Sequence, residues 1–127
     1  MRYLLDTNIL IEAAGNTALA VAALEQAVLS DWVGYSAITR LELFGYPDLT
    51  SDEEVVLRLL AGELEEVVVT SSVIDRAIQI RKSIRIKVPD SIIAATALEM
   101  DAVLMTRNEG DFKAVKGLNI INPWRKE

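Results

Sequence analysis

Residues 2–11 read RYLLDTNILI, and this stretch joins a predicted strand to a predicted helix through an acidic residue. The run RYLL at 2–5 is typical of a buried strand, and it ends at Asp6. From Thr7 to about Ala14 the pattern predicts a helix. A strand that leads directly into a helix is the first half of a βαβ unit, so the fold depends on whether this alternation continues.

The alternation does continue along the chain. We expect further strands at WVGY (32–35), EVVVT (66–70), AVLMT (102–106) and NII (119–121). Helices are expected at 17–29, from Ser36 onward, at 51–60, at 72–86 and from Pro89 onward, with Ser51 and Glu54 as a capping box and a similar pair at Ser72 and Asp75. The sequence therefore predicts a single α/β domain over residues 1–127, with a parallel sheet flanked by helices.

Composition excludes several classes of protein. No apolar run approaches the roughly 18 residues that a membrane span needs, and Asp6 interrupts the start where a signal peptide would be uncharged, so we expect a soluble, cytoplasmic protein. The chain has no Cys and no His, which excludes disulfides, thiolate nucleophiles, Cys/His zinc sites and imidazole catalysis. Any catalysis must use carboxylates, hydroxyls, Lys, Arg, Tyr, or a metal with oxygen ligands.

Charge is unevenly distributed. The net charge of −6 argues weakly against a nucleic-acid partner. However, residues 48–66 are strongly acidic, whereas basic residues gather at 76–87, namely Arg76, Arg81, Lys82, Arg85 and Lys87. Either both runs are solvated helix faces, or the polarity serves binding.

Polar side chains follow the ends of three predicted strands. They are Asp6, Thr7 and Asn8, then Ser36 and Thr39, then Thr106, Arg107 and Asn108. In open parallel sheets, ligands bind in the crevice beyond these carboxyl ends.

Asp90 is the acid that most needs an explanation. In VPDSIIAATAL (88–98) it shares a helical stripe with Ile93, Ala94 and Ala97, the pattern of a core-facing side. An acid in a first helical turn complements the helix dipole, which is one interpretation. A buried, unpaired carboxylate nevertheless costs several kcal/mol, so a compensating partner is expected.

Three more acids have structural alternatives of their own. Asp6 is suited to be an N-cap, Glu42 to lie at the border of an amphipathic helix, and Asp111 to follow Gly110 in a turn. All four nevertheless map to the strand-end crevice, where clustered carboxylates repel unless a cation neutralises them. Oxygen ligands select Mg²⁺ or Mn²⁺, and such a site suits phosphodiester hydrolysis.

The chain resembles PIN-domain nucleases, and in its length and motifs the VapC type of toxin ribonuclease. The resemblance is carried by LLDTNILI (4–11), SAITRLELFG (36–45), VPDSIIAATAL (88–98), LMTRNEGDF (104–112) and GLNIINP (117–123). It implies a PIN-like fold with a five-stranded parallel sheet and a metal-dependent endoribonuclease. By the same resemblance Asp6, Glu42, Asp90 and Asp111 hold Mg²⁺ or Mn²⁺, with Asn8 and Thr106 in support.

The resemblance also implies partners. These are an RNA substrate, a cognate VapB-like antitoxin whose tail lies in an apolar groove, and a second copy in a homodimer. Candidate groove residues are Leu19, Ala23, Leu41, Phe44 and Tyr46, for which core or dimer packing is the alternative. Candidate RNA-binding residues are Arg40, Arg85, Lys87 and Arg107, together with Arg81 and Lys82.

Two other functions remain open from the sequence. A PIN-like fold that acts as a non-catalytic RNA-binding or interaction module is disfavoured because all four acids are present. A phosphoacceptor signalling domain needs paired acids after the first strand and an acceptor Asp after the third. Here Asp6 is followed by Thr7 and Asn8, and the third predicted strand ends at Thr70.

Overall fold

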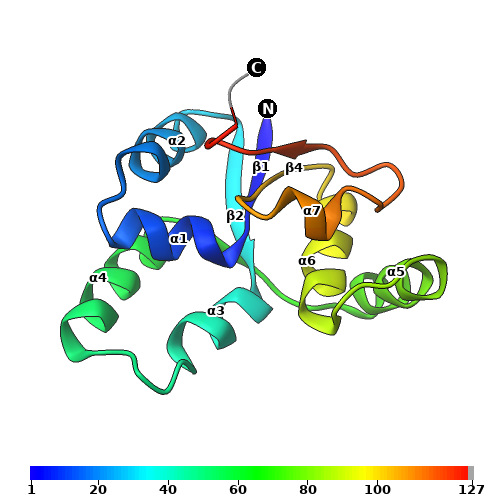
Figure 1. Cartoon of the computed structure of the whole chain (residues 1–127), viewed down its shortest axis with the longest axis horizontal. Coiled ribbons are helices and arrows are strands. Elements are labelled where there is room, and N and C mark those ends of the chain that lie inside the picture. The colour runs from blue at the N-terminus through cyan, green and yellow to red at the C-terminus, as the bar shows by residue number, and fades with distance from the viewer. Residues whose placement is uncertain (126–127) are drawn as a thin grey trace.

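The computed structural model describes residues 1–125 as one α/β unit with five strands and seven helices (Figure 1). The strands are β1 (Arg2–Leu5), β2 (Trp32–Ser36), β3 (Glu65–Val67), β4 (Val103–Met105) and β5 (Ile120–Ile121). The helices are α1 (Thr7–Ala14), α2 (Ala18–Val28), α3 (Ala37–Phe44), α4 (Ser51–Gly62), α5 (Ser71–Ser83), α6 (Val88–Glu99) and α7 (Glu109–Phe112).

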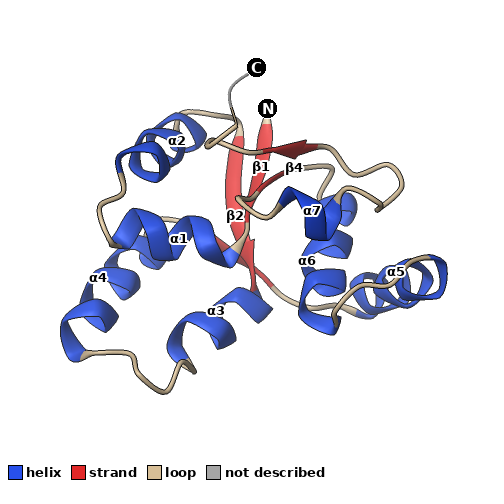
Figure 2. Ribbon diagram, in the orientation of Figure 1, coloured by secondary structure: helices blue, strands red, loops and turns tan. Residues whose placement is uncertain are grey.

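The five strands form one fully parallel sheet in the order β3-β2-β1-β4-β5. Helices lie on both sides of it, with α1, α2 and α4 on one side and α5 and α6 on the other (Figure 2). The predicted sheet is therefore confirmed. The strand order reverses between β1 and β4. The first half of the chain adds β2 and then β3 on one side of β1, and the second half adds β4 and then β5 on the other side. A crevice for ligands is expected at this point.

Alternating side chains of the central strands build two separate cores. Leu4 and Leu104 point to the core under α5 and α6, whereas Leu5 and Met105 point to the core under α1, α2 and α4. Successive strand residues face opposite sides of a sheet, so each helical layer receives its own apolar contacts. Helix α6 is buried along most of its length, as the apolar run of residues 91–97 predicts.

Several predicted boundaries are wrong by a few residues. The strand expected at 66–70 ends at Val67, because its only neighbour β2 ends at the paired residue Ser36. Val68 and Val69 are consequently outside the sheet, with 64% and 36% of their surface exposed. The turn expected at Asp111 is instead the short helix α7.

The N-terminal caps of α4 and α5 also differ from the prediction. Thr50 and Glu53 form the capping box of α4, in place of Ser51 and Glu54. Thr70 caps α5, while Ser72 hydrogen-bonds to Glu99 on α6. Both true caps lie one or two residues before the predicted ones.

No single helix within residues 1–125 is long and apolar enough to cross a membrane. Helices α1 and α2 reach the necessary length and composition only when taken together, and they are bent by 115° relative to each other.

Candidate active site

Asp6 lies at the carboxyl end of β1, where the order of the sheet reverses. Its backbone N–H donates to the Met105 carbonyl oxygen at 2.9 Å, which joins the ends of β1 and β4. Asp6 as a residue is 5% exposed, and its carboxylate accepts hydrogen bonds from the Thr106 hydroxyl (2.7 Å), the Thr7 N–H (2.8 Å) and the Asn8 amide (3.2 Å). Burial raises the pKa of Asp6 while the Thr106 and Thr7 hydrogen bonds lower it, and the nearby Glu42 charge raises it further.

Asn8 and Thr106 support Asp6 and also fix the loop after β4. The Thr106 hydroxyl accepts from the Asn108 N–H at 2.9 Å while it donates to Asp6. The Asn8 side-chain oxygen accepts from the Arg107 N–H at 3.3 Å. The two predicted supporting residues therefore lie against the carboxylate that they were expected to support.

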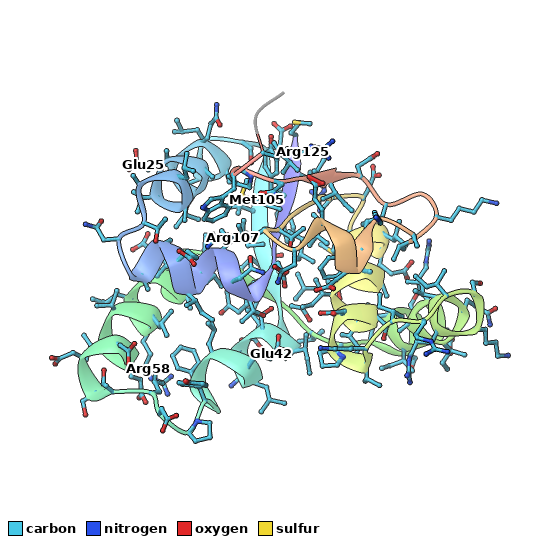
Figure 3. All side chains as sticks on the ribbon, viewed as in Figure 1. Glu25, Glu42, Arg58, Met105, Arg107 and Arg125 are labelled. Atoms are coloured by element: carbon cyan, nitrogen blue, oxygen red, sulfur yellow. The ribbon has the colours of Figure 1, made fainter. Side chains whose placement is uncertain are left out.

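Glu42 lies on α3 and reaches the beginning of α1. Its Oε1 accepts the Thr7 hydroxyl at 2.7 Å, and that hydroxyl is also hydrogen-bonded to the Thr39 hydroxyl at 3.0 Å. In Figure 3, Glu42 and Arg107 appear on opposite sides of α1. Glu42 is itself exposed, so Thr7 is the contact that connects it to the buried end of β1.

Asp90 is partly buried in the first turn of α6. Burial, followed by the charges of Asp6, Asp111 and Glu42, raises the pKa of its carboxyl from 3.8 to about 6, against a smaller opposing effect of Lys87. The negative charges come from three other segments of the chain. The four acids predicted from the sequence therefore belong to one electrostatic cluster.

Asp111 lies on α7 and is exposed. Its N–H donates to the Asn108 carbonyl at 3.1 Å, so α7 continues directly from the loop that Thr106 and Asn8 hold. Asp111 acts on Asp90 through its charge.

Two of the predicted RNA-binding side chains are engaged within the protein. Arg40 forms an ion pair with Glu66 at 2.7 Å. Arg107 pairs with Glu12 on α1 at 2.9 Å, and its guanidinium carbon lies 4.8 Å from the centre of the Trp124 ring. Arg85 and Lys87 are exposed in the segment between α5 and the buried part of α6, next to Asp90 in the sequence.

Most of the chain matches a known protein family. The model of the PIN domain matches residues 3–118. The chain belongs to the PIN domain family. A search of curated proteins gave no match.

Several solved structures resemble this PIN domain along nearly its whole length. FitAcB from Neisseria gonorrhoeae is 31% identical, with a TM-score of 0.76 and coverage of 98% of this chain and 99% of that one. A toxin–antitoxin complex from Klebsiella pneumoniae is 28% identical, with a TM-score of 0.80 and coverage of 98% and 99%. VapBC2 from Rickettsia felis, bound to a promoter DNA fragment, is 24% identical, with a TM-score of 0.84 and coverage of 96% and 98%, and this likeness shows the fold alone.

The acidic edge of this PIN domain has the donor chemistry of a hard-cation site, since every candidate ligand is a carboxylate oxygen. Within residues 1–125, however, no three acidic side chains are arranged so that they hold an ion as they stand. Asp6 is fixed by its hydrogen bonds, whereas Glu42 and Asp111 are exposed and have room to adjust. The residues fit a divalent cation in chemistry and in charge.

Sequence reasoning marked Thr7 and Thr39 as polar residues that follow strand ends, but it assigned them no role in the site. Their contact with Glu42 joins residues 35 positions apart, and no local pattern predicts such a contact.

Proposed function

We propose that this chain is an endoribonuclease that depends on Mg²⁺ or Mn²⁺ and acts as the toxin of a type II toxin–antitoxin pair. The observation that carries the proposal is the gathering of acids at one edge of the sheet: Asp6 is held at the end of β1 and Glu42 reaches the same place through Thr7. Asp90, in the first turn of α6, lies within the electrostatic influence of Asp6, Glu42 and Asp111, which together with burial raises its pKa. Such a cluster destabilises the fold unless a cation neutralises it. Membership of the PIN domain family and likeness to a toxin–antitoxin complex from Klebsiella pneumoniae support the same function.

In this proposal Asp6, Glu42, Asp90 and Asp111 hold the ion. A divalent ion supplies Lewis acidity that activates water for attack on a phosphodiester and stabilises the charge on the leaving oxygen. Thr106 and Asn8 fix the Asp6 carboxylate, and the buried stripe of α6 keeps the Asp90 end of that helix rigid. The residues thus present negative charge at a fixed place before any substrate binds.

RNA cleavage by the purified protein tests the proposal. We expect cleavage of a fluorescent single-stranded RNA with Mg²⁺ and none with EDTA. Asp6→Asn and Asp90→Asn should abolish it, whereas Asp75→Asn, which changes an exposed acid on α5, should not. Cleavage that persists unchanged in both site variants would overturn the mechanism.

A groove next to the site supports the proposal of an antitoxin partner. It has a volume of about 720 Å³ and lies between α1, α3 and α4. Its apolar lining includes Ile11, Leu43, Tyr46, Leu49, Val56 and Leu57, and its acidic lining is Glu12, Glu42, Asp52 and Glu53. This lining suits a segment with apolar and basic side chains. Because Glu42 belongs to both groove and site, an occupant of the groove would also block the site.

The groove differs in part from the predicted one. Tyr46 lines it, whereas Leu19 and Ala23 line a second hollow beside β5, and Leu41 and Phe44 line neither. We expect the product of a small neighbouring reading frame, VapB-like in kind, to inhibit cleavage. Val56→Asp in the groove should weaken that inhibition, and Val55→Asp on the same helix should not.

The homodimer is proposed on the resemblance alone, and sedimentation velocity tests it.

The alternative of a non-catalytic module has one observation in its favour. The described acids are not arranged as a ready metal-binding group. Calorimetric titration with Mn²⁺ separates the two functions, because a module that has lost catalysis would bind no divalent ion.

A further inference from the structure

Thr7 connects two of the four acids through one residue. Its backbone N–H donates to Asp6 Oδ1 at 2.8 Å, and its hydroxyl donates to Glu42 Oε1 at 2.7 Å. Asp6 belongs to the end of β1, whereas Glu42 belongs to α3. The relative position of these two carboxylates therefore depends on the conformation of Thr7.

The Thr7 side chain is itself held in place. Its hydroxyl is hydrogen-bonded at 3.0 Å to the hydroxyl of Thr39, which is fully buried. Glu42, in contrast, is an exposed side chain with several rotatable bonds. Because the Thr7 hydroxyl is fixed and the Glu42 side chain is not, their hydrogen bond favours the Glu42 rotamers that keep its carboxylate at Thr7, next to Asp6.

Glu42 is bound by a neutral donor, whereas five other glutamates each form an ion pair with an arginine. These five are Glu12, Glu54, Glu66, Glu99 and Glu109. An arginine neutralises the carboxylate that it binds, whereas a hydroxyl orients the carboxylate and leaves its charge unchanged. Glu42 is thus oriented with its negative charge available to a cation.

We infer that Thr7 is a positioning residue, whose hydroxyl holds the Glu42 carboxylate beside Asp6 for cation binding. This inference rests on the proposed function, because it assumes that the acids bind a divalent ion. Residues that hold metal ligands by hydrogen bonds typically contribute about 10- to 100-fold to metal affinity.

Electron paramagnetic resonance of free Mn²⁺, titrated with the full-length metal-free protein, tests the inference. We expect Thr7→Val, which removes the hydroxyl and keeps the shape, to weaken Mn²⁺ binding about tenfold. Thr7→Ser, which keeps the hydroxyl, should restore affinity to near the wild-type value. Thr7→Ala serves as the second hydroxyl-free variant if Thr7→Val does not fold, and melting temperature reports folding.

A double-mutant cycle separates positioning from a general structural role. If Thr7 acts through Glu42, Thr7→Val has no further effect on Mn²⁺ affinity in a Glu42→Gln background. An equal loss of Mn²⁺ affinity in both backgrounds would overturn the role of Thr7, and so would wild-type affinity in Thr7→Val. In either case, Mn²⁺ binding that is lost in Asp6→Asn would still support the proposed function. Absence of Mn²⁺ binding by the wild-type protein would overturn both.

Discussion

Asp90 links stability to the proposed chemistry at the scale of a single residue. Its pKa is raised from 3.8 to about 6, so the folded protein holds this proton more tightly than the unfolded chain does. The carboxyl therefore favours folding below pH 3.8 and loses this contribution as the pH rises through about 6. At neutral pH, without a cation, an ionised Asp90 opposes folding.

We therefore predict that Asp90→Asn stabilises the metal-free protein at pH 7.5. The gain should be on the order of 1 kcal/mol, allowing for solvent screening of a partly exposed group. Urea unfolding with EDTA measures it, and the gain should shrink when the same measurement is made at pH 4.5. Mg²⁺ should raise the stability of the wild-type protein and leave that of Asp90→Asn unchanged. Destabilisation of the variant in EDTA would contradict this account of Asp90.

Thr106 provides a second test at this scale, because it is fully buried and donates to a buried carboxylate. Thr106→Val should lower the free energy of unfolding by about 1.5–3 kcal/mol, the range for hydrogen bonds to charged groups. Thr96→Val is the control, since Thr96 is equally buried but donates to the neutral Ile92 carbonyl, whereas the Thr106 hydroxyl also accepts the Asn108 N–H. The control should lose less, about 1 kcal/mol. Equal losses in urea unfolding would argue against an ionised Asp6.

At the scale of elements, the cap of α4 shows where local sequence signals are ambiguous. Thr50 and Ser51 are adjacent hydroxyl residues, and each is followed three positions later by a glutamate. Both fit the capping-box pattern, but only Thr50 occupies the N-cap position with extended backbone angles. Which of the two residues becomes the N-cap depends on the backbone conformation of the loop between α3 and α4.

This ambiguity gives a direct test of the assigned cap. Thr50→Ala should lower the free energy of unfolding by about 1 kcal/mol, because it leaves the Glu53 N–H without its side-chain acceptor. Ser51→Ala, inside the first turn of α4, should change it by less than about 0.5 kcal/mol. The reverse order of these two effects in chemical unfolding would place the cap at Ser51.

The sequence predicts elements well where the signal is local. The strand at 2–5 and the helix at 7–14 are confirmed residue for residue, because Asp6 separates two clear patterns. The strand at 66–70 is overextended, since its end is set by the length of β2 and not by its own valines. Similarly, strand-end position indicates Asp6 and Thr106 as site residues, whereas the Thr7–Glu42 contact needs the tertiary structure.

At the scale of the whole molecule, ion pairing divides the predicted RNA-binding residues into two classes. Arg40 and Arg107 are occupied by Glu66 and Glu12. Arg85 and Lys87 are exposed, and Lys87 acts electrostatically on Asp90. The groove on the other flank of the site is lined by Glu42, Asp52 and Glu53 in addition to the arginine-paired Glu12, and these three acids repel phosphates. The RNA strand is therefore expected to approach over the segment between α5 and α6.

A comparison of three single variants tests this direction of approach. Arg85→Ala and Lys87→Ala should raise KM for a single-stranded RNA several-fold and leave kcat nearly unchanged, because they remove phosphate contacts and not chemistry. Each should also reduce the slope of log KM against log salt concentration by about 1, the value for one lost phosphate contact. Arg40→Ala, whose side chain is already neutralised, should have little effect on either quantity. If Arg40→Ala raises KM as much as Lys87→Ala does, the RNA instead crosses α3. The acidic groove would then not keep RNA away from that side of the site.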